Sequence, residues 1–213
     1  MDFEVLRERM VDEQLIPRGI RNARVLDAFR KVPRHIFVPD ELSDSAYADY
    51  PLPIGKGQTI SQPYMIALMT ESLNLVPGEK VLEVGTGSGY QLAILLEILG
   101  QAYSVEKVQS LAEEASGTLK KAGYDNFSIN VGDGTLGWED EAPFDAILVT
   151  AAAPKAPDSL LGQLKYGGRM AIPVGGRFSQ VLTLFRKEKT GLSVNEICGC
   201  VFVPLIGREG WEE

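Results

Sequence analysis

The chain has 213 residues, enough for one domain with a sizeable core and too few for two of ordinary size. Hydrophobic residues make up 45% of it and charged residues 23%, near the averages for folded globular proteins, so neither disorder nor membrane residence is expected. The formal net charge of −8 disfavours a nucleic-acid partner, because cationic side chains supply most of the affinity for phosphates. No apolar run approaches the length that spans a bilayer, and the first residues lack the order of a signal peptide, so we expect a cytoplasmic protein.

The first part of the chain, residues 1–63, is expected to form a helical cover followed by an irregular lid. Apolar residues at helical spacing predict two short helices, one within 3–16 and one around 25–29. Prolines then recur from Pro33 to Pro63 and interrupt regular structure.

The remainder alternates strand and helix patterns and ends in a hairpin pattern. We expect helices at 64–75, 89–99, 107–122 and 157–164, and strands at 79–84, 101–106, 127–131, 144–149, 168–174, 180–186 and 193–203. Strands that alternate with helices form parallel βαβ units. The prediction is therefore a single α/β domain over 1–213: a doubly wound, mostly parallel seven-stranded Rossmann-like sheet. Residues 64–178 would form its cofactor-binding core, and 179–213 a C-terminal antiparallel hairpin with a tail.

A glycine-rich turn, Gly85-Thr86-Gly87-Ser88-Gly89, follows the first strand of the core. Glycine lets a ligand approach the backbone, and the next helix offers free N–H groups. The second strand ends at Glu106, about 20 residues on, where a carboxylate can accept both hydroxyl protons of a ribose. The G-x-G-x-G spacing, with Glu83 two residues before it, differs from the G-x-G-x-x-G of dinucleotide-binding turns. It is typical of S-adenosylmethionine-dependent methyltransferases.

Two later segments bear on the ligand and the acceptor. Gly132-Asp133-Gly134 follows the third strand, where the fold places an adenine whose exocyclic amine an aspartate can receive; the same residues would also suit an ordinary Asp-Gly turn. After the fourth strand, the small residues of 150–154 lack the polar, proline and aromatic side chains that hold a flipped base. A nucleobase acceptor is therefore not expected.

The chain resembles the protein-L-isoaspartate O-methyltransferase family along nearly its whole length. The motifs that carry the resemblance lie at 51–55, 58–63, 84–90, 132–134, 151–154, 164–169, 172–175 and 202–205. The resemblance implies transfer of a methyl group from S-adenosylmethionine, leaving S-adenosyl-L-homocysteine, to the α-carboxylate of L-isoaspartyl residues in damaged proteins and peptides. The ester would then close to a succinimide, and repeated cycles would return most of the damage to aspartate. We expect a monomer.

The resemblance also implies the site residues. Ser61 would be the catalytic residue at the reacting centre, and the substrate would contact it together with Val203, Pro204 and Leu205. With the motifs above, the expected cofactor-binding residues are Gln58, Thr59, Ile60, Tyr64, Glu83, Gly85, Thr86, Gly87, Glu106, Lys107, Gly132, Asp133, Gly134 and Thr150. Tyr64 stands where several members of the family carry histidine.

The chemistry requires no general base, because a sulfonium methyl is a strong electrophile and a carboxylate is already an anion at neutral pH. The sole histidine, His35, is accordingly expected to be a packing residue or a surface contact. Ser61 has a second interpretation, as the N-cap of a helix that begins near Pro63.

Other charged and sulfur-containing residues are expected to have no role in the chemistry. Lys56, Arg169 and Arg177 are expected to be solvated surface charges. Cys198 and Cys200, two apart in a strand-like segment, are expected to be reduced packing residues, and no metal site is predicted.

Three other functions stay open. A methyltransferase with another carboxylate or a small-molecule acceptor would keep the cofactor residues and differ in 58–63. A nicotinamide-dependent oxidoreductase is disfavoured by the glycine spacing, and a non-catalytic binding module by the intact cofactor motifs.

Overall fold

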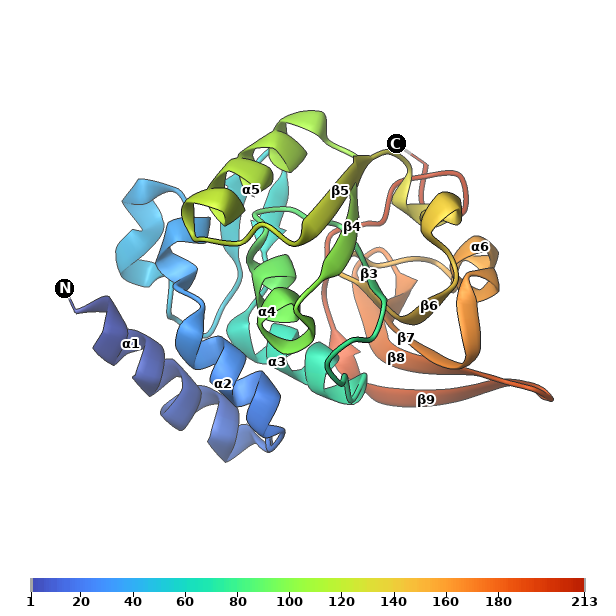
Figure 1. Cartoon of the computed structure of the whole chain (residues 1–213), viewed down its shortest axis with the longest axis horizontal. Helices are drawn as coiled ribbons and strands as arrows, with labels where there is room; N and C mark the ends of the chain where they lie inside the picture. Colours follow the sequence, from blue (N-terminus) through green and yellow to red (C-terminus); the bar gives the residue numbers. More distant parts are fainter. Residues whose placement is uncertain (1, 213) are drawn as a thin grey trace.

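The computed structural model describes residues 2–212 and is built on a seven-stranded sheet (Figure 1). The strand order is β5-β4-β3-β6-β7-β8-β9. The strands are β3 (Val81–Val84), β4 (Ala102–Glu106), β5 (Phe127–Val131), β6 (Phe144–Val149), β7 (Leu164–Gly176), β8 (Ser179–Glu188) and β9 (Gly191–Cys200). Strands β3 to β7 pair in parallel, and β8 and β9 pair antiparallel. The predicted fold class is confirmed.

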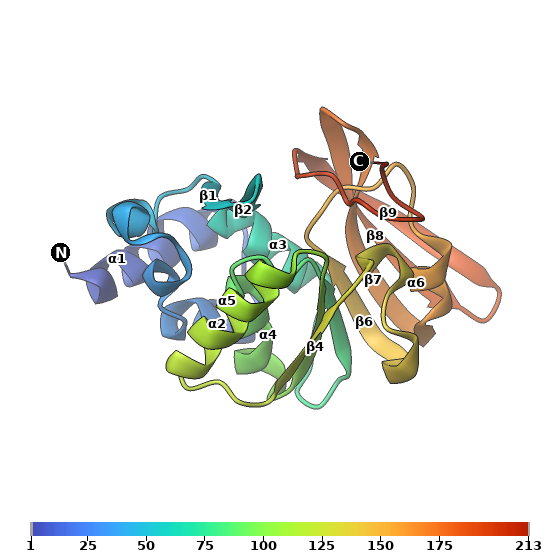
Figure 2. The ribbon, with the colours of Figure 1, turned by 90° about the horizontal axis from the view of Figure 1, so that it is seen from above.

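The α-helices cover this sheet in two unequal layers. They are α1 (Phe3–Arg9), α2 (Ala23–Lys31), α3 (Pro63–Ser72), α4 (Tyr90–Leu99), α5 (Gln109–Lys121) and α6 (Asp158–Gly162). A π-helical turn over Met10–Leu15 continues α1, and short 3₁₀ turns lie at Ile16–Arg18, Arg34–Phe37, Asp40–Ser45, Gly134–Leu136 and Glu139–Glu141. In Figure 2, α2 to α5 lie to the left of the sheet and α6 to the right. All predicted helices are present, with bounds that differ slightly.

The central strands are apolar on both faces because both are covered. Ala146 and Leu148 of β6 belong to the core cluster that includes the N-terminal helices and α4. The residues that alternate with them, Ile147 and Val149, belong to a second cluster that includes Leu160 of α6. Side chains alternate between faces along a strand, and a parallel sheet covered on both sides reads as a continuous apolar run. The fold therefore presents its strand ends, rather than its faces, to a ligand.

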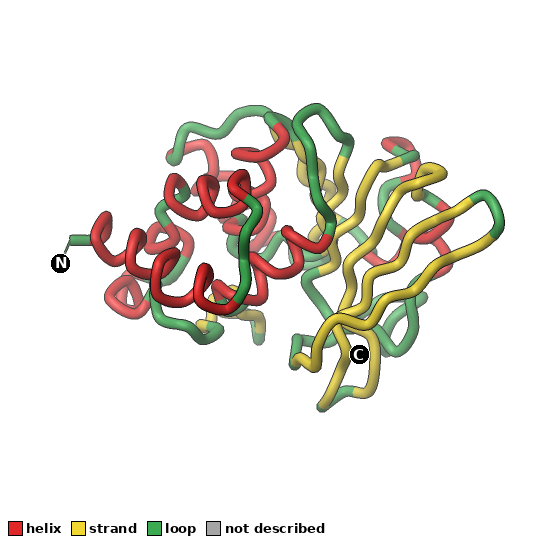
Figure 3. The backbone as a smooth tube through the Cα atoms, turned by 90° about the horizontal axis from the view of Figure 1, so that it is seen from below, coloured by secondary structure: helices red, strands yellow, loops and turns green. Residues whose placement is uncertain are grey.

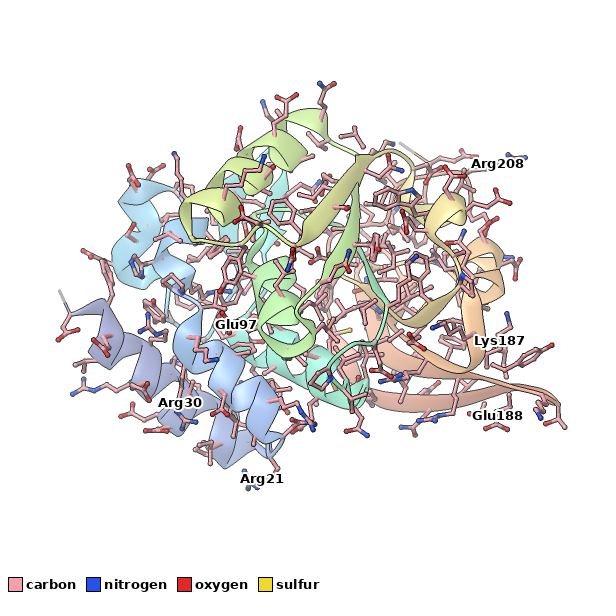
Figure 4. The ribbon with its side chains drawn as sticks, in the orientation of Figure 1. Arg21, Arg30, Glu97, Lys187, Glu188 and Arg208 are labelled. Atoms are coloured by element: carbon pink, nitrogen blue, oxygen red, sulfur yellow. The ribbon has the colours of Figure 1, made fainter. Side chains whose placement is uncertain are left out.

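Ion pairs fasten the N-terminal helices to one another. Arg30 of α2, labelled in Figure 4, pairs with Glu8 at 3.1 Å and with Asp12 at 2.9 Å. The other face of α2 buries Val25 and Phe29 in the core. The cover is thus joined to the sheet layer by apolar packing, with exposed charges on its outside.

The C-terminal hairpin is tied to α6 by one lysine. The strands β8 and β9 extend away from the helical side of the molecule (Figure 3). Lys187 of β8 donates hydrogen bonds to the carbonyl oxygens of Leu161, Gly162 and Leu164, with its Nζ 2.8 Å from the last two. A cation at a helix C-terminus satisfies carbonyls that have no partner within the helix.

The lid predicted to be irregular contains a small antiparallel hairpin, so that prediction is wrong for 52–60. Strands β1 (Leu52–Gly55) and β2 (Gln58–Ile60) pair across a two-residue turn. Both turn residues, Lys56 and Gly57, have positive φ, the geometry that matches the twist of a two-residue hairpin. The prolines that argued against a strand are tolerated because the pair has free edges.

The second hairpin strand ends earlier than predicted. Strand β9 stops at Cys200, and residues 201–203 leave the sheet. The chain instead runs beside Ala152, whose N–H donates to Val203 O and whose carbonyl accepts from Leu205 N, both at 2.8 Å. Pro204 has no N–H to donate to a β-ladder, and the segment pairs with Ala152 through the two flanking residues, Val203 and Leu205. That change carries 203–205 to the end of β6.

Arg169 is not the solvated surface charge that the sequence predicted. The residue is 8% exposed, and its side chain donates to the carbonyl oxygens of Leu73 and Asn74 and pairs with Glu79 at 2.6 Å. Burial alone would raise the pKa of Glu79, but the hydrogen bonds and charge of Arg169 hold that pKa below its usual value. The guanidinium therefore joins the end of α3 to the start of β3.

Within residues 2–212, no helix is long and apolar enough to cross a membrane.

Candidate active site

A cavity lies at the carboxyl ends of β3, β4 and β6, beside the β1–β2 hairpin. In a doubly wound sheet, this is the edge where the strand order reverses and ligands bind. The predicted residues that line it are Gln58, Thr59, Ile60, Ser61, Gly85, Thr86, Gly87, Glu106, Lys107, Gly134, Thr150, Val203, Pro204 and Leu205.

Sequence reasoning missed several residues of this lining. They are Ile66, Met69, Val84, Ser88, Gln91, Val105, Val108, Ala151 and Ile206. Gln91 had a detectable signal, because it is a buried polar residue in the first turn of the otherwise apolar α4. Ile66 and Met69 had none, since an apolar residue facing a cavity looks like a core residue.

The glycine-rich turn needs glycine for a physical reason at Gly85. Its φ is +96°, and a Cβ there would collide with the hydroxyl of Thr150. That hydroxyl lies 2.7 Å from Gly85 O and 3.0 Å from Val84 O. The loop therefore packs directly against the residue that follows β6, and its backbone lines the cavity.

Glu106 supports the same loop from the neighbouring strand. Its carboxylate accepts from the backbone N–H of Gly87 and from that of Val108, each at 2.9 Å. The residue is 6% exposed and lines the cavity. Each carboxylate oxygen has a second lone-pair site, so both can accept further hydrogen bonds from a ligand diol.

Glu83 lies behind the glycine loop and outside the cavity lining. It accepts a 2.6 Å hydrogen bond from Ser104, whose hydroxyl is also 2.6 Å from that of Thr86. Full burial raises the pKa of Glu83 well above its usual value; the Ser104 hydrogen bond opposes that rise, and the charge of Glu106 adds to it. The structure therefore places Glu83 where it can hold Thr86 in position.

Of the turn 132–134, the cavity is lined by Gly134 and by neither of the other two residues. Asp133 accepts from the backbone and hydroxyl of Thr135 through one oxygen, and from the backbone N–H of Arg208 at 2.8 Å through the other. These hydrogen bonds outweigh burial and hold the pKa of Asp133 below its usual value. They join the turn to the C-terminal tail, where Figure 4 labels Arg208.

A second cavity adjoins the first and shares Thr59, Ser61, Thr150 and Val203 with it. Tyr64 lines this groove instead of the first cavity, with the guanidinium of Arg18 at 3.5 Å from its ring centroid. The other residues of the groove include Gln62, Cys198, Cys200 and Phe202. Both cysteines are free, as predicted.

The hydroxyl of Ser61 is not used as a helix cap. Helix α3 begins at Pro63 with Gln62 as its N-cap residue and without a side-chain capping hydrogen bond. The capping interpretation of Ser61 is therefore wrong. Its backbone carbonyl accepts a 2.7 Å hydrogen bond from Arg34, and its side chain lies on the wall common to both cavities.

His35 lies outside both linings and packs as predicted. Its ring stacks on Phe3 at a centroid distance of 4.0 Å, and its Nδ1 is 2.8 Å from the Tyr47 hydroxyl. Burial, with a smaller effect of Arg7, lowers the pKa of His35. The imidazole is therefore not placed to exchange protons with a ligand in either cavity.

Sequence comparisons match the chain over its full length. A family model described as protein-L-isoaspartate(D-aspartate) O-methyltransferase matches residues 6–210. Protein-L-isoaspartate O-methyltransferase 1 of Syntrophobacter fumaroxidans is 54% identical over 212 residues, covering 100% of this chain and 99% of the relative. Protein-L-isoaspartate O-methyltransferase of Geobacter metallireducens is 53% identical, covering 99% and 98%.

Solved structures agree with the sequence relatives. One described as protein-L-isoaspartate O-methyltransferase superposes with a TM-score of 0.85 at 30% identity, covering 96% of this chain and 67% of that one. Another, described as a protein-L-isoaspartate O-methyltransferase from Plasmodium falciparum in complex with S-adenosyl-L-homocysteine, gives 0.83 at 29% identity, covering 94% and 98%.

The doubly wound sheet, the glycine loop after β3 and the carboxylate at the end of β4 define an S-adenosylmethionine-dependent methyltransferase of the Rossmann-like class. The extent of the sequence match then identifies the branch of that class. This chain belongs to the protein-L-isoaspartate(D-aspartate) O-methyltransferase family.

Proposed function

We propose that this chain transfers the methyl group of S-adenosylmethionine to the α-carboxylate of L-isoaspartyl residues in damaged proteins and peptides. The observation that carries the proposal is the position of Ser61 on the wall between the two cavities. The first cavity has the glycine loop and Glu106 of a cofactor site, and the second adjoins it at Ser61, where the acceptor would lie. Full-length relatives that bear the same family name support the choice of acceptor.

The cofactor would occupy the first cavity with its ribose on Glu106. The backbone of Gly85, Thr86 and Gly87 would receive the amino-acid arm, and Gln58, Thr59 and Ile60 would cover it from the β1–β2 hairpin. Lys107, Gly134 and Thr150 complete the proposed walls. Glu83, Gly132 and Asp133 would act from behind these walls, by holding the loops that make contact.

The acceptor peptide would lie in the second cavity, which Tyr64 and Val203 both line. Val203 lines the first cavity as well, together with Pro204 and Leu205, so a peptide held at this segment would bring its carboxylate toward the cofactor. The family name of the full-length relatives favours a protein acceptor over the alternative of a small acid.

The reaction needs alignment and no proton transfer. One carboxylate oxygen attacks the sulfonium methyl, the C–S bond breaks, and its electron pair stays on sulfur as the neutral thioether of S-adenosyl-L-homocysteine. Ser61 would donate a hydrogen bond to the other oxygen and so orient the attack. Proximity and exclusion of water would supply the rate enhancement.

The test is a methyl-transfer assay on an isoaspartyl peptide and its aspartyl twin, with a free dicarboxylic acid as a third acceptor. We expect base-labile labelling of the isoaspartyl peptide and little of the others. Equal labelling of the twins would contradict the proposed specificity, and labelling of the free acid alone would favour the small-molecule alternative.

We also propose that the enzyme works as a monomer in the cytoplasm. The net charge of −8 favours separation of copies, and two free cysteines suit a reducing compartment. Light scattering coupled to gel filtration tests the monomeric state. Fractionation of cells tests the cytoplasmic location.

A further inference from the structure

Arg34 is a fully buried arginine whose side chain connects the backbone at Ser61 to the backbone at Ala46. Its relative exposure is 0%. Its Nε donates to Ala46 O and its Nη2 donates to Ser61 O, each at 2.7 Å. Both acceptors are backbone carbonyls, so this side chain fixes the course of two loops that are far apart in sequence.

The charge of Arg34 is costly where it stands. Among the described residues, no carboxylate lies within salt-bridge distance of it, and its Nη1 has no hydrogen-bond partner. Burial lowers the pKa of Arg34 to about 10, opposed by Tyr90 and by the electrostatic effects of Tyr47 and Asp49, so the side chain is still a cation at neutral pH. A buried, incompletely paired charge destabilises a fold, which calls for a function that offsets the cost.

The same guanidinium also contacts the element that begins at the glycine loop. It lies over the ring of Tyr90, 4.8 Å from the centroid. Tyr90 is the first residue of α4, directly after Gly89, and is fully buried. Arg34 therefore touches, through one rigid planar group, the residue after the cofactor loop and the backbone of Ser61.

We propose that Arg34 is a positioning residue for methyl transfer, which sets the place of the Ser61 hydroxyl relative to the glycine loop. The inference rests on the proposed function. Arg34 itself touches neither cavity and acts through the Ser61 backbone. A lysine in its place could reach one carbonyl as a point donor, but could not span both with a planar fork.

The experiment compares Arg34→Met and Arg34→Lys with a matched control, Arg169→Lys. Arg169 of β7 is also buried and donates to the backbone carbonyls of Leu73, Asn74 and Asp145, but its contacts lie beside the end of α3, and it lines neither cavity. Each variant is measured for cofactor affinity by calorimetry, for melting temperature, and for the single-turnover rate at saturating isoaspartyl peptide. Rates are expressed per cofactor-binding site, so that unfolded protein does not count.

We expect Arg34→Met to lower the single-turnover rate by roughly 10- to 100-fold, because it removes the charge-assisted hydrogen bonds that hold the Ser61 backbone in place. The single-turnover rate of Arg34→Lys should lie between those of Arg34→Met and the parent. The cofactor Kd should change by less than about threefold in both variants. Arg169→Lys should melt at a lower temperature and keep the parental rate per site. If Arg34→Met does not fold, Arg34→Lys alone decides.

A double variant, Arg34→Met with Ser61→Ala, tests whether the effect passes through Ser61. Residues that act on one contact are non-additive, so the double variant should be no more than about threefold slower than Ser61→Ala alone. Parental rates in the Arg34 variants, or additive losses in the double variant, overturn the inference while leaving the proposed function intact. An inactive parent enzyme overturns both.

Discussion

The carboxylate of Glu106 accepts a hydrogen bond from the backbone N–H of Gly87 at 2.9 Å, which ties the end of β4 to the loop that follows β3. Strands β3 and β4 are adjacent and parallel, so the loop after β3 lies beside the end of β4. One side chain thus holds the loop in shape and faces the cavity that the loop lines.

Glu106→Ala should weaken cofactor binding. Loss of a charged acceptor costs about 1.5–3 kcal/mol, so the expected change in Kd is roughly 10- to 150-fold. Glu106→Gln keeps the shape and one acceptor oxygen, and its Kd should lie in between. Calorimetry measures both, and an unchanged Kd in the alanine variant would remove Glu106 from the cofactor site.

Ser61→Ala should lower methyl transfer and leave the fold intact. A lost hydrogen bond to the reacting carboxylate is worth ~1–3 kcal/mol, or roughly a 5- to 150-fold slower single turnover. Cofactor affinity and melting temperature should change little, because the hydroxyl caps no helix. The matched control is Ser72→Ala, which removes a hydroxyl that bonds to Met69 O within α3. A control that slows transfer equally would show that the effect is not specific to Ser61.

Glu83→Gln should change how stability depends on pH. Since burial raises the folded-state pKa of Glu83, the parent is favoured below the unfolded pKa and loses stability as pH rises toward the folded value. The amide cannot ionise, so the advantage of the variant should grow with pH above ~4.5, at up to ~1.4 kcal/mol per pH unit.

Glu79→Gln is the control of opposite sign. The pKa of Glu79 is lowered by its pairing with Arg169. The ion pair therefore contributes to the free energy of unfolding at neutral pH, and this contribution is lost as pH falls. Thermal melts between pH 3 and pH 8 should therefore show Glu83→Gln gaining stability relative to the parent above about pH 4.5, and Glu79→Gln approaching the stability of the parent below about pH 4.5. A Glu83→Gln curve parallel to that of the parent would mean that Glu83 is ionised in the folded protein.

The chemical step should be nearly independent of pH between about pH 6 and 8. The acceptor carboxylate is ionised throughout that range, and no general base is needed. His35, the histidine that could titrate there, packs on Phe3 and Tyr47 away from both cavities. Single-turnover rates of the parent and of His35→Gln should give the same flat profile. A bell-shaped profile in the parent would reveal a proton transfer that this mechanism lacks.

The glycine loop and the acid at the end of the next strand were predictable because their signals are local. A strand, a turn and a helix follow one another within 81–99, and Glu106 comes one βα unit later. The β1–β2 hairpin was missed because its prolines suggest irregular structure, while the positive φ of Lys56 carries no strong sequence signal. The division into 1–63, 64–178 and 179–213 remains a prediction.

Charged residues were the least predictable, since their partners lie far away along the chain. Arg169 was expected on the surface, yet it pairs with Glu79 ninety residues earlier. Asp133 was expected to face an adenine, and its oxygens instead hold Thr135 and the tail at Arg208. A charge has the same sequence signature whether it is solvated or buried, and only its neighbours in space distinguish the two.

The alternation of strands and helices, the glycine spacing and the family motifs determined by sequence alone that this is a Rossmann-like methyltransferase, because periodicity and backbone geometry are encoded within a few residues of each position. Tertiary structure decided which side chains reach the cavities and which support them. Arg34 meets Ser61 across 27 residues, and segment 203–205 meets Ala152 across more than 50. Such contacts depend on how the elements pack, which no local pattern records.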